Sequence, residues 1–248
     1  MRLIVFLCLC LATPVFAKTV ATVSPIAHSM SQALLADTDI KVDYLPPTRL
    51  PLNRVASWLD KNRTEPVDSY DAYVTMRSLR PELDFYPTLR VSNIRIVPID
   101  MAVALIPGGE QVARQDNADY FWLNPSNALM MLGILKRDFI ALWPEQKQRI
   151  EDNYRHTADG LRQLLLSLDE QLLQRGYEGI VLTQEELSPL SQSLMLPTLA
   201  PAEAELFHAI VITNRPSDQA NQWAVDDFSR FQTTPFLQRW RSNIDQLP

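Results

Sequence analysis

The residue types that are scarce in this chain exclude several kinds of functional site. Its two cysteines, Cys8 and Cys10, lie at the amino terminus in a segment that we expect to be removed, which leaves no disulfide and no cysteine metal site. The three histidines, His28, His156 and His208, are scattered along the chain. The six glycines form no phosphate-binding motif. Thiol chemistry and glycine-rich nucleotide loops are therefore excluded.

Long hydrophobic runs are also missing, apart from one short run near the start. Residues 3–11 are apolar, follow Arg2 and precede a small-residue segment that ends at Ala17. This arrangement is typical of a secretory signal peptide, with cleavage expected after Ala17. No later run approaches the roughly 20 apolar residues of a membrane-spanning helix. We therefore expect a periplasmic protein that does not span the membrane.

Charge and motifs narrow the function further. The chain has 23 lysines and arginines against 29 aspartates and glutamates, a net charge of −6, and loss of Arg2 with the signal makes it more negative. Nucleic-acid-binding domains usually carry the opposite excess, so we expect no nucleic-acid partner. The metalloprotease HExxH and hydrolase GxSxG patterns are absent as well, and we expect no enzyme.

Short apolar strands alternate with helical patterns in the first half of the chain. This alternation is typical of an α/β fold with a parallel sheet, and it predicts an N-terminal lobe over residues 18–123. The expected strands are residues 19–23, 40–44, 72–76 and 94–97, and the expected helices are residues 25–35 and 53–61.

A helical segment is expected over residues 124–176. Asn124 is a favourable N-cap and Pro125 a favourable first residue for a helix that ends near Trp143. A second helix follows Pro144, and at 1.5 Å per residue it would extend about 46 Å before Gly176 ends it. A helix of that length can join two lobes.

The rest of the chain predicts a smaller C-terminal lobe. Residues 177–248 contain two expected strands, 179–182 and 209–213, and two expected helices, 185–194 and 235–244. The predicted fold is therefore α/β, with two small lobes that have parallel sheets, a long joining helix and a shortened second lobe.

One segment, Tyr120-Phe121-Trp122-Leu123-Asn124-Pro125, is similar to a known pattern from Trp122 onward. The metal-binding proteins of zinc and manganese ABC importers carry His-x-Trp-Leu-(Asp/Ser)-Pro there, and the histidine is a ligand. Further similarities follow in the same order along the chain: Val20–Ile26, Tyr44-Leu45-Pro46-Pro47, Asp71–Val74, Pro81–Leu83, and Gly179–Leu182 followed by Gln184-Glu185.

The resemblance implies two α/β lobes with a metal held in the cleft between them, and delivery to an ABC permease. The chain departs from the family at the ligand positions. No histidine follows Pro47, Tyr120 takes the second position, and Gln184 takes or adjoins the third. We find no clear counterpart of the carboxylate that supplies the fourth ligand. Phenol and amide groups are poor substitutes for imidazole and carboxylate.

Six residues are candidates for ligand contact by their positions, and none is assigned as a metal ligand: Tyr120, Gln184, Glu185, His28, Asn53 and Arg54. Five of them have a structural alternative. Tyr120 lies beside two aromatic residues and is suited to the core, and the Gln184-Glu185 pair suits a helix start. His28 is a lone histidine, which more often has a structural role, and Arg54 suits the solvated surface.

These observations lead to two hypotheses. The first is a periplasmic solute-binding protein of the importer type with a degenerate metal site, in which zinc or manganese is the expected transported ligand and an ABC permease the expected partner. The second is a non-transporting periplasmic protein that uses the same scaffold for another ligand or for protein interaction.

Overall fold

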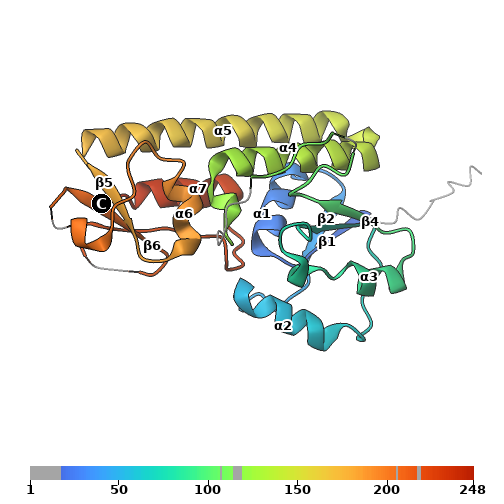
Figure 1. Ribbon diagram of the computed structural model, residues 1–248. Coiled ribbons are helices and arrows are strands. Elements are labelled where there is room, and N and C mark those ends of the chain that lie inside the picture. The colour runs from blue at the N-terminus through green and yellow to red at the C-terminus, as the bar shows by residue number, and fades with distance from the viewer. Residues whose placement is uncertain (1–17, 107, 114–118, 205, 217–218) are drawn as a thin grey trace, which may run out of the picture.

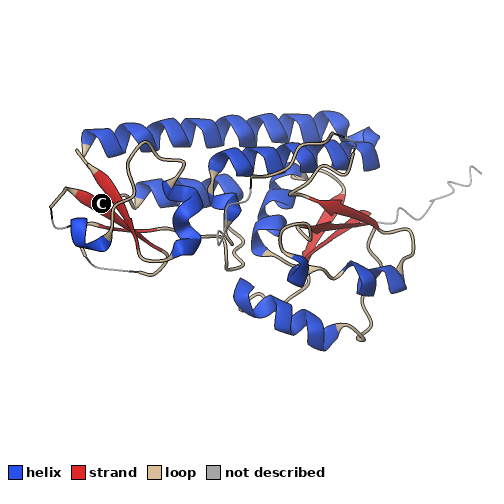
Figure 2. Cartoon of the chain, viewed as in Figure 1, coloured by secondary structure: helices blue, strands red, loops and turns tan. Residues whose placement is uncertain are grey.

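The computed structural model describes residues 18–106, 108–113, 119–204, 206–216 and 219–248. The expected signal peptide lies outside the described residues. Two groups of strands are separated in space, and helices cover them (Figures 1 and 2). In chain order the elements of the first half are β1 (Lys18–Thr22), α1 (Pro25–Leu34), β2 (Ile40–Tyr44), α2 (Leu52–Asn62), β3 (Ala72–Thr75), α3 (Tyr86–Ser92) and β4 (Val97–Asp100). Those of the second half are α4 (Pro125–Leu142), α5 (Lys147–Gln174), β5 (Gly179–Leu182), α6 (Ser188–Ser191), β6 (Ala209–Thr213), β7 (Gln222–Ala224) and α7 (Phe236–Asp245).

The N-terminal lobe contains a parallel four-stranded sheet in the order β2-β1-β3-β4. Its central strands are apolar on both faces, as parallel strands covered by helices usually are. Val20, Ala21, Tyr73 and Val74 have no exposed surface. The fold class predicted from strand–helix alternation is confirmed in this lobe.

The C-terminal lobe is smaller and contains a parallel three-stranded sheet in the order β5-β6-β7. Ile180, Ile210 and Ile212 are fully buried in it. Because every strand of this sheet is parallel to its neighbour, the carboxyl ends of all three lie at one edge.

Helix α5 joins the two lobes. It contains 28 residues and is therefore about 42 Å long. It contacts α1 and α4 on the side of the N-terminal lobe and α7 on the side of the C-terminal lobe, and Figure 1 shows it running along both. The long joining helix that was predicted between Pro144 and Gly176 is present.

The start of α4 agrees with its sequence signals. The Asn124 side chain accepts hydrogen bonds from the backbone N–H groups of Ser126 and Asn127, at 3.0 and 3.4 Å, and Pro125 is the first helical residue. Trp122 lies just before this cap and is fully buried. The sequence signals therefore locate the first turn of α4 correctly.

Several local predictions were wrong. The last strand of the first sheet begins at Val97 rather than at residue 94, because residues 94–95 form a turn closed by the Asn93 side chain on the Arg95 N–H at 3.0 Å. The expected helix at residues 185–194 is only a 3-10 turn followed by the single turn of α6. Helix α3 and strand β7 were not predicted at all.

Within the described part of the chain, no helix combines the length and the apolar character required to cross a membrane.

Candidate functional site

A cleft of about 580 Å³ lies where the two lobes face each other. Its floor and one wall come from the carboxyl ends of β5, β6 and β7, the edge at which ligands of parallel α/β sheets usually bind. The opposite wall comes from the first turn of α2 and from Tyr120. The lining residues are Pro51, Leu52, Asn53, Tyr120, Gln184, Glu186, Asn214, Arg215, Pro216, Val225, Asp226, Asp227, Ser229, Arg230 and Gln232.

Three of the residues proposed from sequence line this cleft: Asn53, Tyr120 and Gln184. Tyr120 is half-buried, and its ring centroid lies 5.3 Å from that of Trp122. Burial, with the nearby charges of Asp227 and Glu186, raises the pKa of the Tyr120 phenol above its ordinary value. At neutral pH this group is therefore an uncharged hydroxyl that can donate a hydrogen bond.

Three other candidates lie outside the lining set. Arg54 is exposed on α2, one residue beyond Asn53. Glu185 is exposed at the start of the 3-10 turn, and the next residue, Glu186, reaches the cleft instead. His28 is buried inside the N-terminal lobe, with 4% of its surface exposed.

His28 belongs to an aromatic cluster that connects the lobes beside the cleft. Its Nδ1 lies 3.3 Å from the Thr22 hydroxyl, and its ring centroid lies 5.0 Å from that of Phe231 and 5.8 Å from that of Tyr44. Phe231 comes from the segment between β7 and α7 and stacks on Tyr44 at 4.8 Å. Burial lowers the pKa of His28 to about 4, so its imidazole is neutral at physiological pH. This contact ties the C-terminal lobe to the N-terminal sheet.

Two carboxylates that the sequence reasoning did not place here, Asp226 and Asp227, line the cleft directly after β7. They follow the short apolar segment 223–225, and polar residues that follow a parallel strand lie at the edge where ligands bind. Recognising them from the sequence would have required recognising β7 first. That strand has only three residues, and its periodicity is too short to be recognised.

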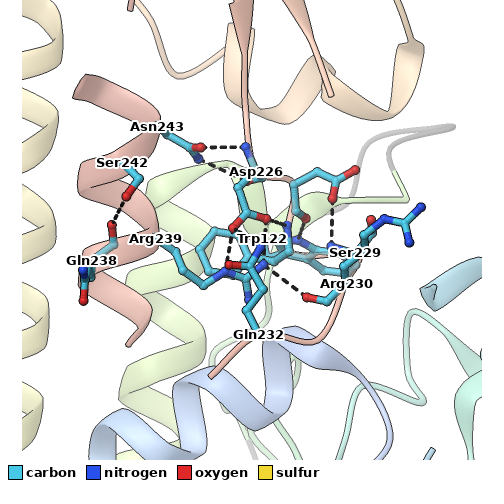
Figure 3. Close-up of polar contacts among 11 residues, drawn as sticks. Trp122, Asp226, Ser229, Arg230, Gln232, Gln238, Arg239, Ser242 and Asn243 are labelled. Carbon is cyan, nitrogen blue, oxygen red and sulfur yellow. Dashed lines mark hydrogen bonds and ion pairs between the residues drawn. The ribbon is translucent and has the colours of Figure 1, made fainter. Parts of the chain in front are cut away.

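The Asp226 carboxylate is occupied by protein groups (Figure 3). It accepts two hydrogen bonds from Arg239, from Nε and Nη2, both at 2.6 Å. It also accepts one from the Phe228 N–H at 2.9 Å and one from Gln232 Nε2 at 3.2 Å. Arg239 is 1% exposed, and its Cζ lies 4.0 Å from the Phe228 ring centroid. Asp226 thus neutralises a buried cation.

Asp227 is likewise committed to structural contacts. One carboxylate oxygen accepts from Asn214 Nδ2 and the other from the Ser229 N–H, each at 2.8 Å. Its backbone carbonyl accepts a hydrogen bond from the Trp122 indole at 3.0 Å. The segment continues into the N-terminal lobe, where the Ser229 carbonyl accepts from the Leu52 N–H at 2.9 Å. Both aspartates therefore hold the cleft together.

The cleft has few of the side chains that usually serve as ligands to a divalent transition metal. The described residues that line it include no histidine or cysteine, and two of their three carboxylates already have internal partners. Across the described residues no group of three or more histidines, cysteines and carboxylates is placed to hold a metal ion. The arrangement is suited to hydrogen bonding with a polar solute.

Comparisons with known proteins agree with this fold. No family model and no curated protein sequence matches the chain. Among solved structures, it is similar to Zn(II)-bound AdcA from Streptococcus pneumoniae, with a TM-score of 0.64 and 13% identity, over 93% of this chain and 57% of AdcA. It is similar to the metal-dependent lipoprotein YcdH from Bacillus subtilis, with a TM-score of 0.65 and 11% identity, over 92% and 97% of the two chains. It is also similar to the solute-binding protein FpvC from Pseudomonas aeruginosa in complex with Mn²⁺, with a TM-score of 0.62 and 12% identity, over 93% and 97%. At these identities the likeness establishes a shared fold.

Proposed function

We propose that this protein is an extracytoplasmic solute-binding protein that captures a small polar solute between its lobes and delivers it to an ABC permease. One observation carries the proposal: a single cleft receives polar side chains from both lobes, Asn53 and Tyr120 on one side and Gln184 and Arg230 on the other. A solute in this cleft would contact both lobes at once. The predicted signal peptide supports export, and the proposal involves no catalytic step.

The size of the cleft supports the same function. Sites for small molecules usually enclose about 300 to 1,000 Å³, and this cleft of about 580 Å³ lies within that range. A bare metal ion needs far less space. AdcA and FpvC hold zinc and manganese in structures of the same fold, and those two metals are included among the probes for this reason.

A cleft-blocking variant tests the proposal. Asn53 is exposed in the first turn of α2 and lines the cleft, so Asn53→Trp would place a large side chain in the solute site. Lys61→Trp is the matched control, because Lys61 is exposed near the other end of the same helix and does not line the cleft. Both variants should fold.

The readout is the melting temperature of the chain from Lys18 onward with Zn²⁺, Mn²⁺, citrate, inorganic phosphate and a set of free amino acids. A solute at about one hundred times its Kd should raise the melting temperature by about 5 to 10 °C in wild type and in Lys61→Trp. The shift should disappear in Asn53→Trp. Absence of any shift in wild type, or a shift that Asn53→Trp leaves intact, would refute capture in this cleft and favour a non-transporting role for the scaffold.

A further inference from the structure

We infer that the solute is a small organic anion, and that Arg215 and Arg230 bind its carboxylate or phosphate oxygens. This inference rests on the proposed function, because it specifies the ligand class of the same cleft. It comes from separating the charged groups that already have protein partners from those that remain available to a ligand.

Among the described lining residues, the charged groups without a protein partner are mostly guanidinium groups. Arg215 and Arg230 are exposed at its lining, and within the described ranges neither guanidinium has a hydrogen bond or ion pair. Arg230 contributes only its backbone carbonyl, which accepts from Arg239 at 3.3 Å. Of the three lining carboxylates, only Glu186 lacks a protein partner in the described chain. Among the described lining residues, two guanidinium groups without a protein partner therefore accompany one carboxylate without a protein partner.

The two aspartates offer few free oxygens to a ligand, although the charge of Asp227, which only uncharged donors contact, remains in the cleft. The charge of Asp226 is neutralised by Arg239, and four hydrogen bonds from protein groups already reach its two oxygens. Both oxygens of Asp227 accept hydrogen bonds at 2.8 Å. A cation that used these oxygens would have to displace the protein donors and leave Arg239 buried without its counterion, which is strongly unfavourable.

The neutral groups of the cleft also offer donors. One end of the Gln184 side-chain amide contacts the Thr183 hydroxyl at 2.7 Å, and in either orientation of the amide at least one N–H remains for a ligand. The Tyr120 phenol, whose pKa is raised by burial, keeps its proton at neutral pH and lies beside the Ser229 side chain. On the opposite wall, the first turn of α2 has no side-chain cap, so the partial positive charge of an 11-residue helix adds to that of the arginines.

This donor set matches an anion whose oxygens spread over several positions. Guanidinium groups bind carboxylate and phosphate through paired, charge-assisted hydrogen bonds. Arg215 follows β6 and Arg230 follows β7, whereas Tyr120 and Asn53 approach from the other wall. A polycarboxylate or an organic phosphate would bridge these walls, while a bare cation would meet two like charges.

Calorimetric titration distinguishes the ligand classes. The chain from Lys18 onward is titrated separately with citrate, inorganic phosphate, Zn²⁺ and Mn²⁺, after removal of metal. The test variant is the double substitution Arg215→Gln with Arg230→Gln. The matched control is Arg95→Gln with Arg149→Gln. These two arginines are exposed, do not line the cleft, and have no guanidinium hydrogen bond or ion pair within the described residues.

We expect citrate or phosphate to bind wild type and the control pair, with at least tenfold weaker binding by the Arg215 and Arg230 double variant. A preference for citrate would indicate an organic carboxylate, and a preference for phosphate would indicate a phosphate-bearing solute. Raising the salt concentration should weaken the binding.

Three results would overturn the inference. If the double variant binds citrate or phosphate as tightly as wild type does, Arg215 and Arg230 do not contact the anion. If neither citrate nor phosphate binds, the assignment of an anionic ligand is wrong. Binding of Zn²⁺ or Mn²⁺ that Asn53→Trp abolishes would also overturn it, but would leave the proposed solute-binding function standing.

Discussion

Replacing Asp226 with asparagine removes the charge that neutralises the buried guanidinium of Arg239. Arg239 is 1% exposed, and its Nε and Nη2 each donate to the Asp226 carboxylate at 2.6 Å. Asparagine has nearly the same shape, but it turns an N–H donor or an uncharged oxygen toward the cation. Removing one partner of a buried ion pair typically costs about 3 to 5 kcal/mol. For a chain of this size the melting temperature should fall by about 10 °C.

Urea denaturation followed by circular dichroism measures this change. Glu186→Gln is the matched control, because it removes an exposed carboxylate charge from the same cleft, and that carboxylate has no partner among the described residues. We expect the control to change the free energy of unfolding by less than about 0.5 kcal/mol. The double variant Asp226→Asn with Arg239→Met should recover most of the loss, because it removes the buried charge as well. Equal stability of Asp226→Asn and Glu186→Gln would refute the structural role assigned to Asp226.

Two further predictions concern the N-terminal lobe and α4. Burial lowers the pKa of His28 to about 4, so the folded protein resists protonation that the unfolded chain accepts below its ordinary pKa of 6.5. The contribution of His28 to stability should therefore be constant above about pH 6.5 and fall by about 3 kcal/mol as the pH drops to 4. The free energy of unfolding is measured against pH for wild type and for His28→Asn. The two curves should differ in this pH range, and parallel curves would contradict the reasoning. Asn124→Ala removes the side-chain cap of α4 and should cost about 1 kcal/mol in urea denaturation, and an unchanged midpoint would contradict the capping role.

The architecture could be predicted from the sequence where local patterns extend over many residues. The long helix α5 was predicted from its length between Pro144 and Gly176, and the start of α4 from the Asn124-Pro125 pair. The structure confirms both. The prediction failed for short elements, because few residues carry the periodicity of such an element. Strand β7 has three residues, and helix α3 begins at Tyr86 with Pro87 in its first turn, where the sequence resembles a loop.

The candidate site shows a different limit. Asn53, Tyr120 and Gln184 could be proposed because each stands at a position that a family resemblance marks, and all three line the cleft. The state of Asp226 could not be predicted, because its partner Arg239 lies 13 residues away on α7 and the pairing depends on how α7 packs. Sequence gives the presence of a carboxylate, whereas the fold decides whether its oxygens are free.

Calorimetric titration of the metal-free chain with citrate, inorganic phosphate, Zn²⁺ and Mn²⁺ tests the central claim most directly. The claim is that this cleft is a solute site whose unpartnered guanidinium groups favour an anion. It predicts heat of binding with citrate or phosphate, which is lost in Asn53→Trp and at least tenfold weaker when Arg215 and Arg230 are both glutamine. Tight binding of Zn²⁺ or Mn²⁺ in the cleft, with no binding of either anion, would contradict it.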